Sequence, residues 1–176
     1  MEMASKGLKR IGVRILLLPA SSAGIFSLDP GRRRFITWFD MYRVFKNLTF
    51  CYAHRLWNYS GRCARLHGHN ALVQVDFART ALTPTGMVVD FDEIKALVQS
   101  YLDEELDHRT ILFRDDPLTE KLKEWGEPVV TMDQNPTAEN LARMIFDFVK
   151  AKGLPIASVQ VWETPSSCAE YSERNA

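Results

Sequence analysis

Apolar and polar positions follow regular periods along most of the chain after Met41. Residues 42–54 and 69–77 are rich in aromatic and β-branched residues with partial period-two alternation, which is typical of strands that bury one face. The turn-forming residues 58–61 lie between these two stretches. The pattern therefore predicts two neighbouring strands joined as a hairpin.

Helical spacing of apolar residues occurs twice further along. One helix is expected after Asp90, which stands three residues before Glu93 as in a carboxylate variant of the capping box. A second is expected to begin at Pro136-Thr137 and to end before Gly153. A last strand is predicted over residues 158–163. The order strand, strand, helix, helix, strand predicts an α+β fold, with helices on one face of an antiparallel sheet.

Composition favours one globular domain and argues against nucleic acid as a partner. The 176 residues are 46% hydrophobic, and 22 basic residues balance 22 acidic ones. A chain of this size can bury a sizeable core, and a strongly basic footprint for nucleic acid is absent overall. The glycines do not form a phosphate-binding fingerprint.

The balanced charge hides two unlike segments, with a formal charge of +4 before Met41 and −4 after it. Residues 15–18 form an apolar run behind basic residues, as in a signal peptide, but the run is short and stops at Pro19. It is also too short for a transmembrane helix. Residues 1–40 are therefore expected to be an extension outside the fold, with a signal peptide or a translation start at Met41 as the alternatives, and residues 41–176 form the working domain.

Three cysteines, Cys51, Cys63 and Cys168, cannot all pair within one chain, and they do not form a dense disulfide framework. Disulfides are rare in reducing compartments, so the cysteine pattern favours a cytoplasmic location.

The chain has four histidines, and three of them could form a metal site. His67 and His69 are two residues apart, which places both imidazoles on one face of an extended chain. His54 ends the preceding strand, so a hairpin could add a third imidazole. Three neutral imidazoles with one open position are the ligand set of a catalytic zinc site. The alternative is that these are ordinary packing or surface histidines.

Other residues carry candidate chemistry with open alternatives. Cys63, between Arg62 and Arg65, could be a zinc ligand, a buried small residue or a catalytic thiol. Asp107 and His108 could form an acid/base unit, although spacing alone favours a histidine placed by a helix dipole. Glu163 shares strand parity with apolar residues, and its carboxylate would suit a flat heterocycle with adjacent N–H donors.

Six blocks in the same order resemble the family of 6-pyruvoyl-tetrahydropterin and 6-carboxy-tetrahydropterin synthases. The blocks are residues 50–56, 63–70, 86–91, 106–108, 136–140 and 162–164. The resemblance implies a tunnelling fold, in which a four-stranded antiparallel sheet carries two helices and assembles into a barrel-like homo-oligomer with active sites between subunits. It also implies a further strand near residues 128–132.

The resemblance assigns roles to nine residues. It implies zinc ligation by His54, His67 and His69, proton transfer by Cys63, and a partner dyad of Asp107 and His108, which reverses the interpretation from spacing alone. It further implies that Glu163 anchors the pterin ring, with Thr137 and Glu139 at the same pocket.

One interval separates the two activities within the family. The gap from Cys63 to His67 resembles that of the 6-carboxy enzymes, whereas the pyruvoyl synthases have a longer gap. The expected reaction converts 7,8-dihydroneopterin triphosphate to 6-carboxy-tetrahydropterin, acetaldehyde and triphosphate, on the way to queuosine. Alternatives are another pterin lyase of this fold, or a non-catalytic zinc-binding module. Residues 109–113 depart from the Leu-Asn that often follows the dyad in the family.

Overall fold

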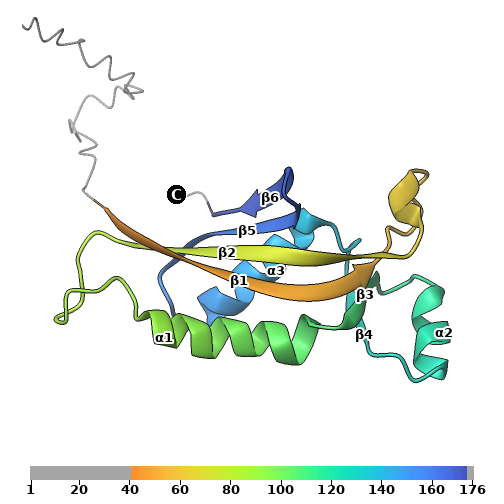
Figure 1. Ribbon diagram of the computed structural model, residues 1–176, viewed down its shortest axis with the longest axis horizontal. Coiled ribbons are helices and arrows are strands. Elements are labelled where there is room, and N and C mark those ends of the chain that lie inside the picture. The colour runs from red at the N-terminus through yellow and green to blue at the C-terminus, as the bar shows by residue number, and fades with distance from the viewer. Residues whose placement is uncertain (1–40, 174–176) are drawn as a thin grey trace, which may run out of the picture. The chain divides into compact units, whose positions relative to one another are not determined.

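A hairpin of two long strands forms the centre of the fold (Figure 1). The computed structural model describes residues 41–173, so the predictions for residues 1–40 lie outside the described residues. Strands β1 (Tyr42–His54) and β2 (His67–Arg79) pair antiparallel along their whole length, with His54 opposite His67. The predicted hairpin is confirmed, and β2 begins at His67, two residues earlier than expected.

Four further strands extend the sheet on both sides. They are β3 (Arg109–Phe113), β4 (Val129–Met132), β5 (Ile156–Thr164) and β6 (Ser167–Tyr171). The six strands lie in the order β4-β3-β1-β2-β5-β6. The pairs β1/β2, β2/β5 and β5/β6 are antiparallel, whereas β3 runs parallel to β1 and β4 runs parallel to β3.

The expected sheet of four antiparallel strands is therefore wrong in strand number and in part of its direction. The strand near residues 128–132 is confirmed as β4. Strands β3 and β6 were not predicted, because each spans only 5 residues and neither alternates clearly between apolar and polar positions. The pairing of β3 depends on β1, which is distant in sequence, whereas β6 forms a hairpin with the preceding strand β5.

The two predicted helices are present and pack on the same face of the sheet (Figure 1). The first begins as α1 (Phe91–Ile94), where the Asp90 carboxylate accepts a hydrogen bond from the Asp92 N–H, and continues through the wider π-helical turns η2 (Lys95–Gln99) and η3 (Leu102–Leu106). The second is α3 (Ala138–Ala151). Two short elements were not predicted, namely α2 (Leu118–Glu124) and the single 3-10 turn η1 (Arg62–Ala64).

The buried core leads directly to the candidate site. Side chains of one parity along β1, β2 and β5 are buried against the helices, including Phe50, Val73 and Val161. Because side chains alternate between the two faces of a strand, Tyr52 and His54 continue this face of β1, and His69 and His67 continue it along β2. The core face thus ends in a cluster of polar side chains. Within residues 41–173, no helix is long and apolar enough to cross a membrane.

Candidate metal centre and active site

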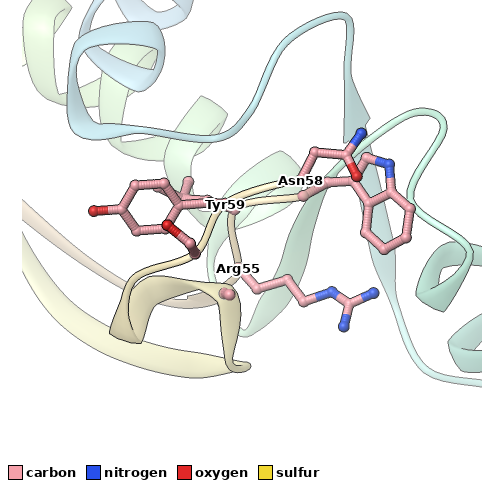
Figure 2. A pocket seen from close by; sticks show the side chains of 7 residues that line it. Arg55, Asn58 and Tyr59 are labelled. Carbon is pink, nitrogen blue, oxygen red and sulfur yellow. The ribbon is translucent and has the colours of Figure 1, made fainter.

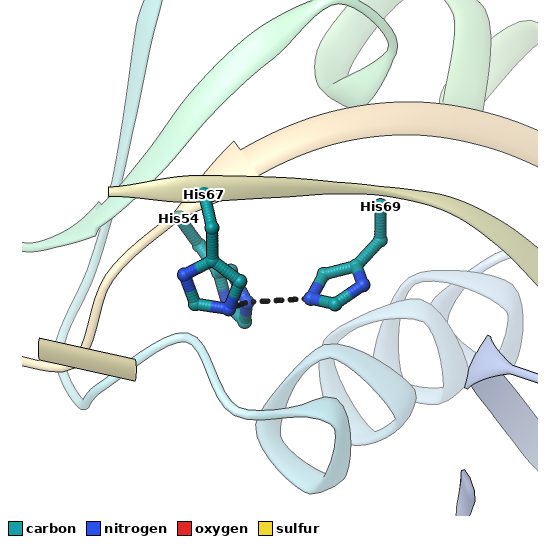
Figure 3. A group of neighbouring side chains, drawn as sticks. All are labelled: His54, His67 and His69. Carbon is teal, nitrogen blue, oxygen red and sulfur yellow. Dashed lines mark hydrogen bonds between the residues drawn. The ribbon is translucent and has the colours of Figure 1, made fainter. Parts of the chain in front are cut away.

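Three imidazoles meet where β1 ends and β2 begins (Figure 3). The Nε2 atom of His54 lies 3.1 Å from Nε2 of His67 and 3.2 Å from Nε2 of His69. The ligand atoms of the three residues all lie within 4.8 Å of one another. The fold therefore brings together the three histidines that the sequence singled out.

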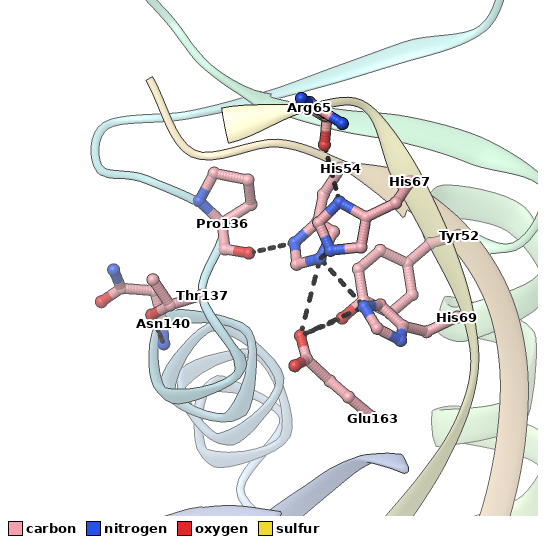
Figure 4. Close-up of polar contacts among 9 residues, drawn as sticks. All are labelled: Tyr52, His54, Arg65, His67, His69, Pro136, Thr137, Asn140 and Glu163. Atoms are coloured by element: carbon pink, nitrogen blue, oxygen red, sulfur yellow. Dashed lines mark hydrogen bonds and ion pairs between the residues drawn. The ribbon is translucent and has the colours of Figure 1, made fainter. Parts of the chain in front are cut away.

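The hydrogen bonds of the other ring nitrogens fix the tautomers of two of these histidines. Nδ1 of His54 lies 2.7 Å from the Pro136 carbonyl oxygen, and Nδ1 of His67 lies 2.8 Å from the Arg65 carbonyl oxygen (Figure 4). A carbonyl only accepts, so each Nδ1 carries a proton, and in the neutral ring each Nε2 then presents a lone pair. Burial also lowers the pKa of His54, which favours its neutral form.

Facing lone pairs without a shared proton repel each other, so a cation between them would stabilise this arrangement. Three neutral imidazole nitrogens match the ligand set of a metal ion that keeps one position open. Ligand nitrogens around a tetrahedral zinc ion lie about 3.3 Å apart. The spacing of the His54 Nε2 atom from its two neighbours is close to that value, so the group could hold a metal ion.

Gly68 allows the two strands to approach closely between the two β2 histidines. A Cβ atom at this position would lie only 2.9 Å from the backbone oxygen of Tyr52. That contact involves backbone and cannot be relieved by rotating a side chain. The glycine between His67 and His69 therefore serves the geometry of the cluster.

Glu163 reaches the same cluster from the end of β5 (Figure 4). Its Oε1 atom lies 3.7 Å from Nε2 of His54 and 4.0 Å from Nε2 of His69. The hydroxyl of Tyr52 donates a hydrogen bond of 2.8 Å to the same oxygen. Burial, together with the adjacent Glu163 carboxylate, raises the pKa of Tyr52, so the hydroxyl keeps its proton and acts as a donor.

The sequence did not single out Tyr52. An aromatic residue at a core-facing strand position is ordinarily a packing residue. Its partner Glu163 lies 111 residues away in sequence, so no local pattern links the two. The sequence did contain one indication, because Tyr52 is two residues before His54 and therefore lies on the same face of β1.

Asp107 and His108 form a contact that the sequence left open. His108 Nδ1 lies 2.6 Å from Asp107 Oδ2, and the other carboxylate oxygen accepts a 2.6 Å hydrogen bond from the Cys51 N–H. Burial acts to raise the pKa of Asp107, but these hydrogen bonds outweigh it and the pKa lies below its ordinary value. The His108 side chain is 79% exposed, and its backbone has the left-handed φ of 55°. The dyad is thus held from one side and presented to solvent.

The remaining predicted residues lie around this region in different settings. Cys63 is half-buried in η1, close in sequence to His67. Thr137 caps α3 next to Pro136, the residue that holds His54, and accepts a 3.4 Å hydrogen bond from the Asn140 N–H. Glu139 is exposed in the first turn of α3. Within residues 41–173, no hydrogen bond or ion pair joins the Asp107 and His108 dyad to the three histidines.

The segment after His54 is anchored to two other loops. Arg55 forms a two-point ion pair with the buried Asp116, with Nε 2.7 Å from Oδ2. The Asn135 side chain accepts a 2.7 Å hydrogen bond from the Trp57 N–H and donates a 3.0 Å hydrogen bond to the Trp57 carbonyl oxygen. These contacts shape a depression of about 410 Å³ (Figure 2). It is lined by Arg55, Leu56, Trp57, Asn58, Tyr59, Ser60 and Ala64.

Comparison with known proteins identifies the family. The family model described as 6-pyruvoyl tetrahydropterin synthase matches residues 43–174. This chain belongs to that family. The 6-carboxy-5,6,7,8-tetrahydropterin synthase of Haemophilus influenzae is 31% identical over 141 residues, covering 76% of this chain and 100% of that protein. A protein of Halobacterium salinarum named as a probable 6-carboxy-5,6,7,8-tetrahydropterin synthase is 37% identical over 122 residues, covering 66% of this chain and 77% of its own length.

Solved structures support the same fold. An uncharacterised protein of Wolinella succinogenes superposes with a TM-score of 0.68 at 27% identity, covering 76% of this chain and 99% of that one. The 6-pyruvoyl tetrahydropterin synthase of Caenorhabditis elegans superposes with a TM-score of 0.58 at 25% identity, covering 77% of this chain and 98% of that one. The predictions of this family, of its α+β fold and of an enzyme are confirmed.

Proposed function

We propose that this protein is a zinc-dependent 6-carboxy-tetrahydropterin synthase. It would convert 7,8-dihydroneopterin triphosphate to 6-carboxy-5,6,7,8-tetrahydropterin, acetaldehyde and triphosphate, a step toward queuosine. The proposal rests on the cluster of three imidazoles with the Glu163 carboxylate beside it, in a chain of the pterin synthase family. The names of the Haemophilus and Halobacterium relatives support the 6-carboxy product.

The three histidines would hold zinc through their Nε2 atoms. Zinc, when bound, would supply Lewis-acid polarisation of the oxygens on the substrate side chain. Glu163 would orient the pterin ring, because a carboxylate can accept two parallel N–H bonds from a heterocycle. Thr137 and Glu139 are proposed at the same pocket, on the turn that carries the His54-binding carbonyl.

Proton transfer is proposed for Cys63 and for the dyad of Asp107 and His108. Asp107 would hold the orientation of the His108 ring through its contact with Nδ1, so that the imidazole would be placed to take up a proton and return it. The triphosphate needs positive charge, for which Arg62 and Arg65 are our candidates because both are exposed beside Cys63.

We further propose a homo-oligomer in which neighbouring subunits share each active site. The His108 side chain faces solvent, and the depression lined by Arg55 and Tyr59 includes none of the three histidines. A second copy that brought its dyad to the zinc site would complete the constellation. The enzyme would comprise residues 41–176 and act in the cytoplasm.

A second candidate is a 6-pyruvoyl-tetrahydropterin synthase, favoured by the description of the matching family model and by the Caenorhabditis elegans structure. The product separates the two. Zinc-loaded protein should be incubated with 7,8-dihydroneopterin triphosphate and the products analysed by mass spectrometry. Acetaldehyde and a carboxy-pterin are expected, whereas a pyruvoyl-pterin would favour the second candidate. No turnover with zinc bound would indicate a non-catalytic zinc-binding module.

A further inference from the structure

One carboxylate oxygen of Glu163 lies between the Tyr52 hydroxyl and the histidine cluster. Its Oε1 atom accepts the Tyr52 hydroxyl at 2.8 Å and lies 3.7 Å and 4.0 Å from the Nε2 atoms of His54 and His69. These nitrogens belong to the group that could hold a metal ion. The Glu163 carboxylate beside the candidate metal centre is therefore held by the buried phenol of Tyr52.

The distances place Oε1 just outside the range of a fourth metal ligand. In a tetrahedral zinc site, every pair of ligand atoms is separated by about 3.3 Å. Oε1 exceeds that separation by a few tenths of an ångström from each of the two histidines. A side-chain rotation that brought Oε1 toward the Nε2 atoms of all three histidines would place it in the fourth position, and carboxylate oxygen is a common zinc ligand.

We propose that Tyr52 is a positioning residue whose hydroxyl holds Glu163 away from the fourth coordination position of the metal centre. This inference rests on the zinc site of the proposed function. A site of three histidines and one carboxylate would be closed, as in structural zinc sites, whereas three histidines leave room for substrate. The hydrogen bond from Tyr52 thus keeps the centre open and leaves Glu163 available for another ligand.

The Tyr52 side chain is itself fixed by packing, so its hydroxyl occupies a defined place. The residue is only 4% exposed, and its ring stacks on Phe50 at a centroid distance of 5.1 Å. The ring also meets His54 edge-on at 5.0 Å. A phenylalanine at position 52 would keep these contacts and remove only the donor, which makes Tyr52→Phe the appropriate variant.

The test is a zinc-competition titration of the purified full chain with a chromogenic chelator, independent of turnover. Removing the hydroxyl should let Glu163 bind the metal, so Tyr52→Phe should lower the zinc Kd by roughly tenfold, the size of effect common for side chains that orient metal ligands. Adding Glu163→Gln to this variant should abolish the gain. Tyr101→Phe is the matched control, because that ring stacks on Phe148, and its zinc Kd should equal that of the wild type.

A cobalt-substituted sample gives a second readout. Tyr52→Phe should alter the cobalt(II) visible absorption, and Tyr52→Phe/Glu163→Gln should restore the wild-type spectrum. An unchanged zinc Kd and cobalt spectrum in Tyr52→Phe would overturn the inference while leaving the proposed enzyme intact. Conversely, zinc binding that responds as expected in a protein that does not turn over the pterin triphosphate would overturn the proposed function alone.

Discussion

At the scale of single residues, the histidines His54 and His108 lie in two different environments. His54 is 3% exposed and is held by a backbone carbonyl, so that it presents an unprotonated nitrogen to its neighbours. His108 is 79% exposed, and its ring is hydrogen-bonded to the Asp107 carboxylate. The first environment suits metal binding and the second suits proton transfer. Zinc binding and turnover should therefore be separable by substitution.

The pair His69→Ala and His108→Ala tests this separation. His69→Ala removes one of the three proposed zinc ligands and should cost the protein most of its zinc binding and its activity. His108→Ala should keep full zinc content but lose roughly 10²-fold or more in kcat, the usual contribution of an acid/base group. Zinc content by elemental analysis and kcat from product formation are the two measurements. Zinc loss in His108→Ala would contradict the assignment.

At the scale of elements, long periodic segments were predictable and short paired segments were not. Strands β1, β2 and β5 and helix α3 are long enough for their periodicity to define a buried face. Strands β3 and β6 are 5 residues each, and the parallel direction of β3 is set by tertiary pairing with β1. Local sequence does not encode that pairing.

The candidate site likewise contains a part that the sequence predicts and a part that depends on tertiary contacts. His67 and His69 were predictable because their spacing alone places them on one face. Their junction with His54 followed from the hairpin, whose register sets His54 opposite His67. The contacts of Glu163 with Tyr52 and the histidines join β5 to β1 and β2 across the sheet, and no sequence period reports such a contact.

The ion pair of Arg55 and Asp116 connects the end of β1 to the start of α2. Asp116 is buried and also accepts a 2.8 Å hydrogen bond from the Leu118 N–H. Burial acts to raise the pKa of Asp116, but the hydrogen bonds from Arg55 and Leu118 outweigh it, so the pKa lies below its ordinary value. A depressed folded-state pKa means that the carboxylate stabilises the fold above pH about 4, and that this stability is lost as pH falls through the folded pKa.

Asp116→Asn should therefore be strongly destabilising at neutral pH. The expected loss is about 3 kcal/mol in the free energy of unfolding at pH 7, because one partner of a buried pair is removed. The difference from the wild type should shrink as the pH falls below about 4. Urea unfolding at pH 7 and at successively lower pH measures this difference in the free energy of unfolding. Asp133→Asn breaks the exposed pair with Arg114 and should change stability by less than about 1 kcal/mol; equal losses in the two variants would refute the special role of Asp116.

At the scale of the whole molecule, the proposed shared site makes a prediction about mixtures. His69→Ala lacks a proposed zinc ligand and His108→Ala lacks the proposed dyad, so each homo-oligomer should lose nearly all activity. If neighbouring subunits complete each site, random mixed oligomers should recover about a quarter of wild-type activity, because that fraction of sites combines two intact halves. Activity after joint refolding is the measurement, and separately refolded samples mixed afterwards are the control. Lack of recovery would place the whole site within one chain.

In the proposed enzyme, His54, His67 and His69 hold a zinc ion on which cleavage of 7,8-dihydroneopterin triphosphate depends. The direct measurement is acetaldehyde release by metal-free protein titrated with zinc. If this zinc ion is required, acetaldehyde and 6-carboxy-tetrahydropterin should appear together, and their rate of formation should rise linearly until about one zinc ion is bound per chain. Equal rates in the metal-free and zinc-loaded protein, or a zinc-loaded protein that releases no acetaldehyde, would contradict it.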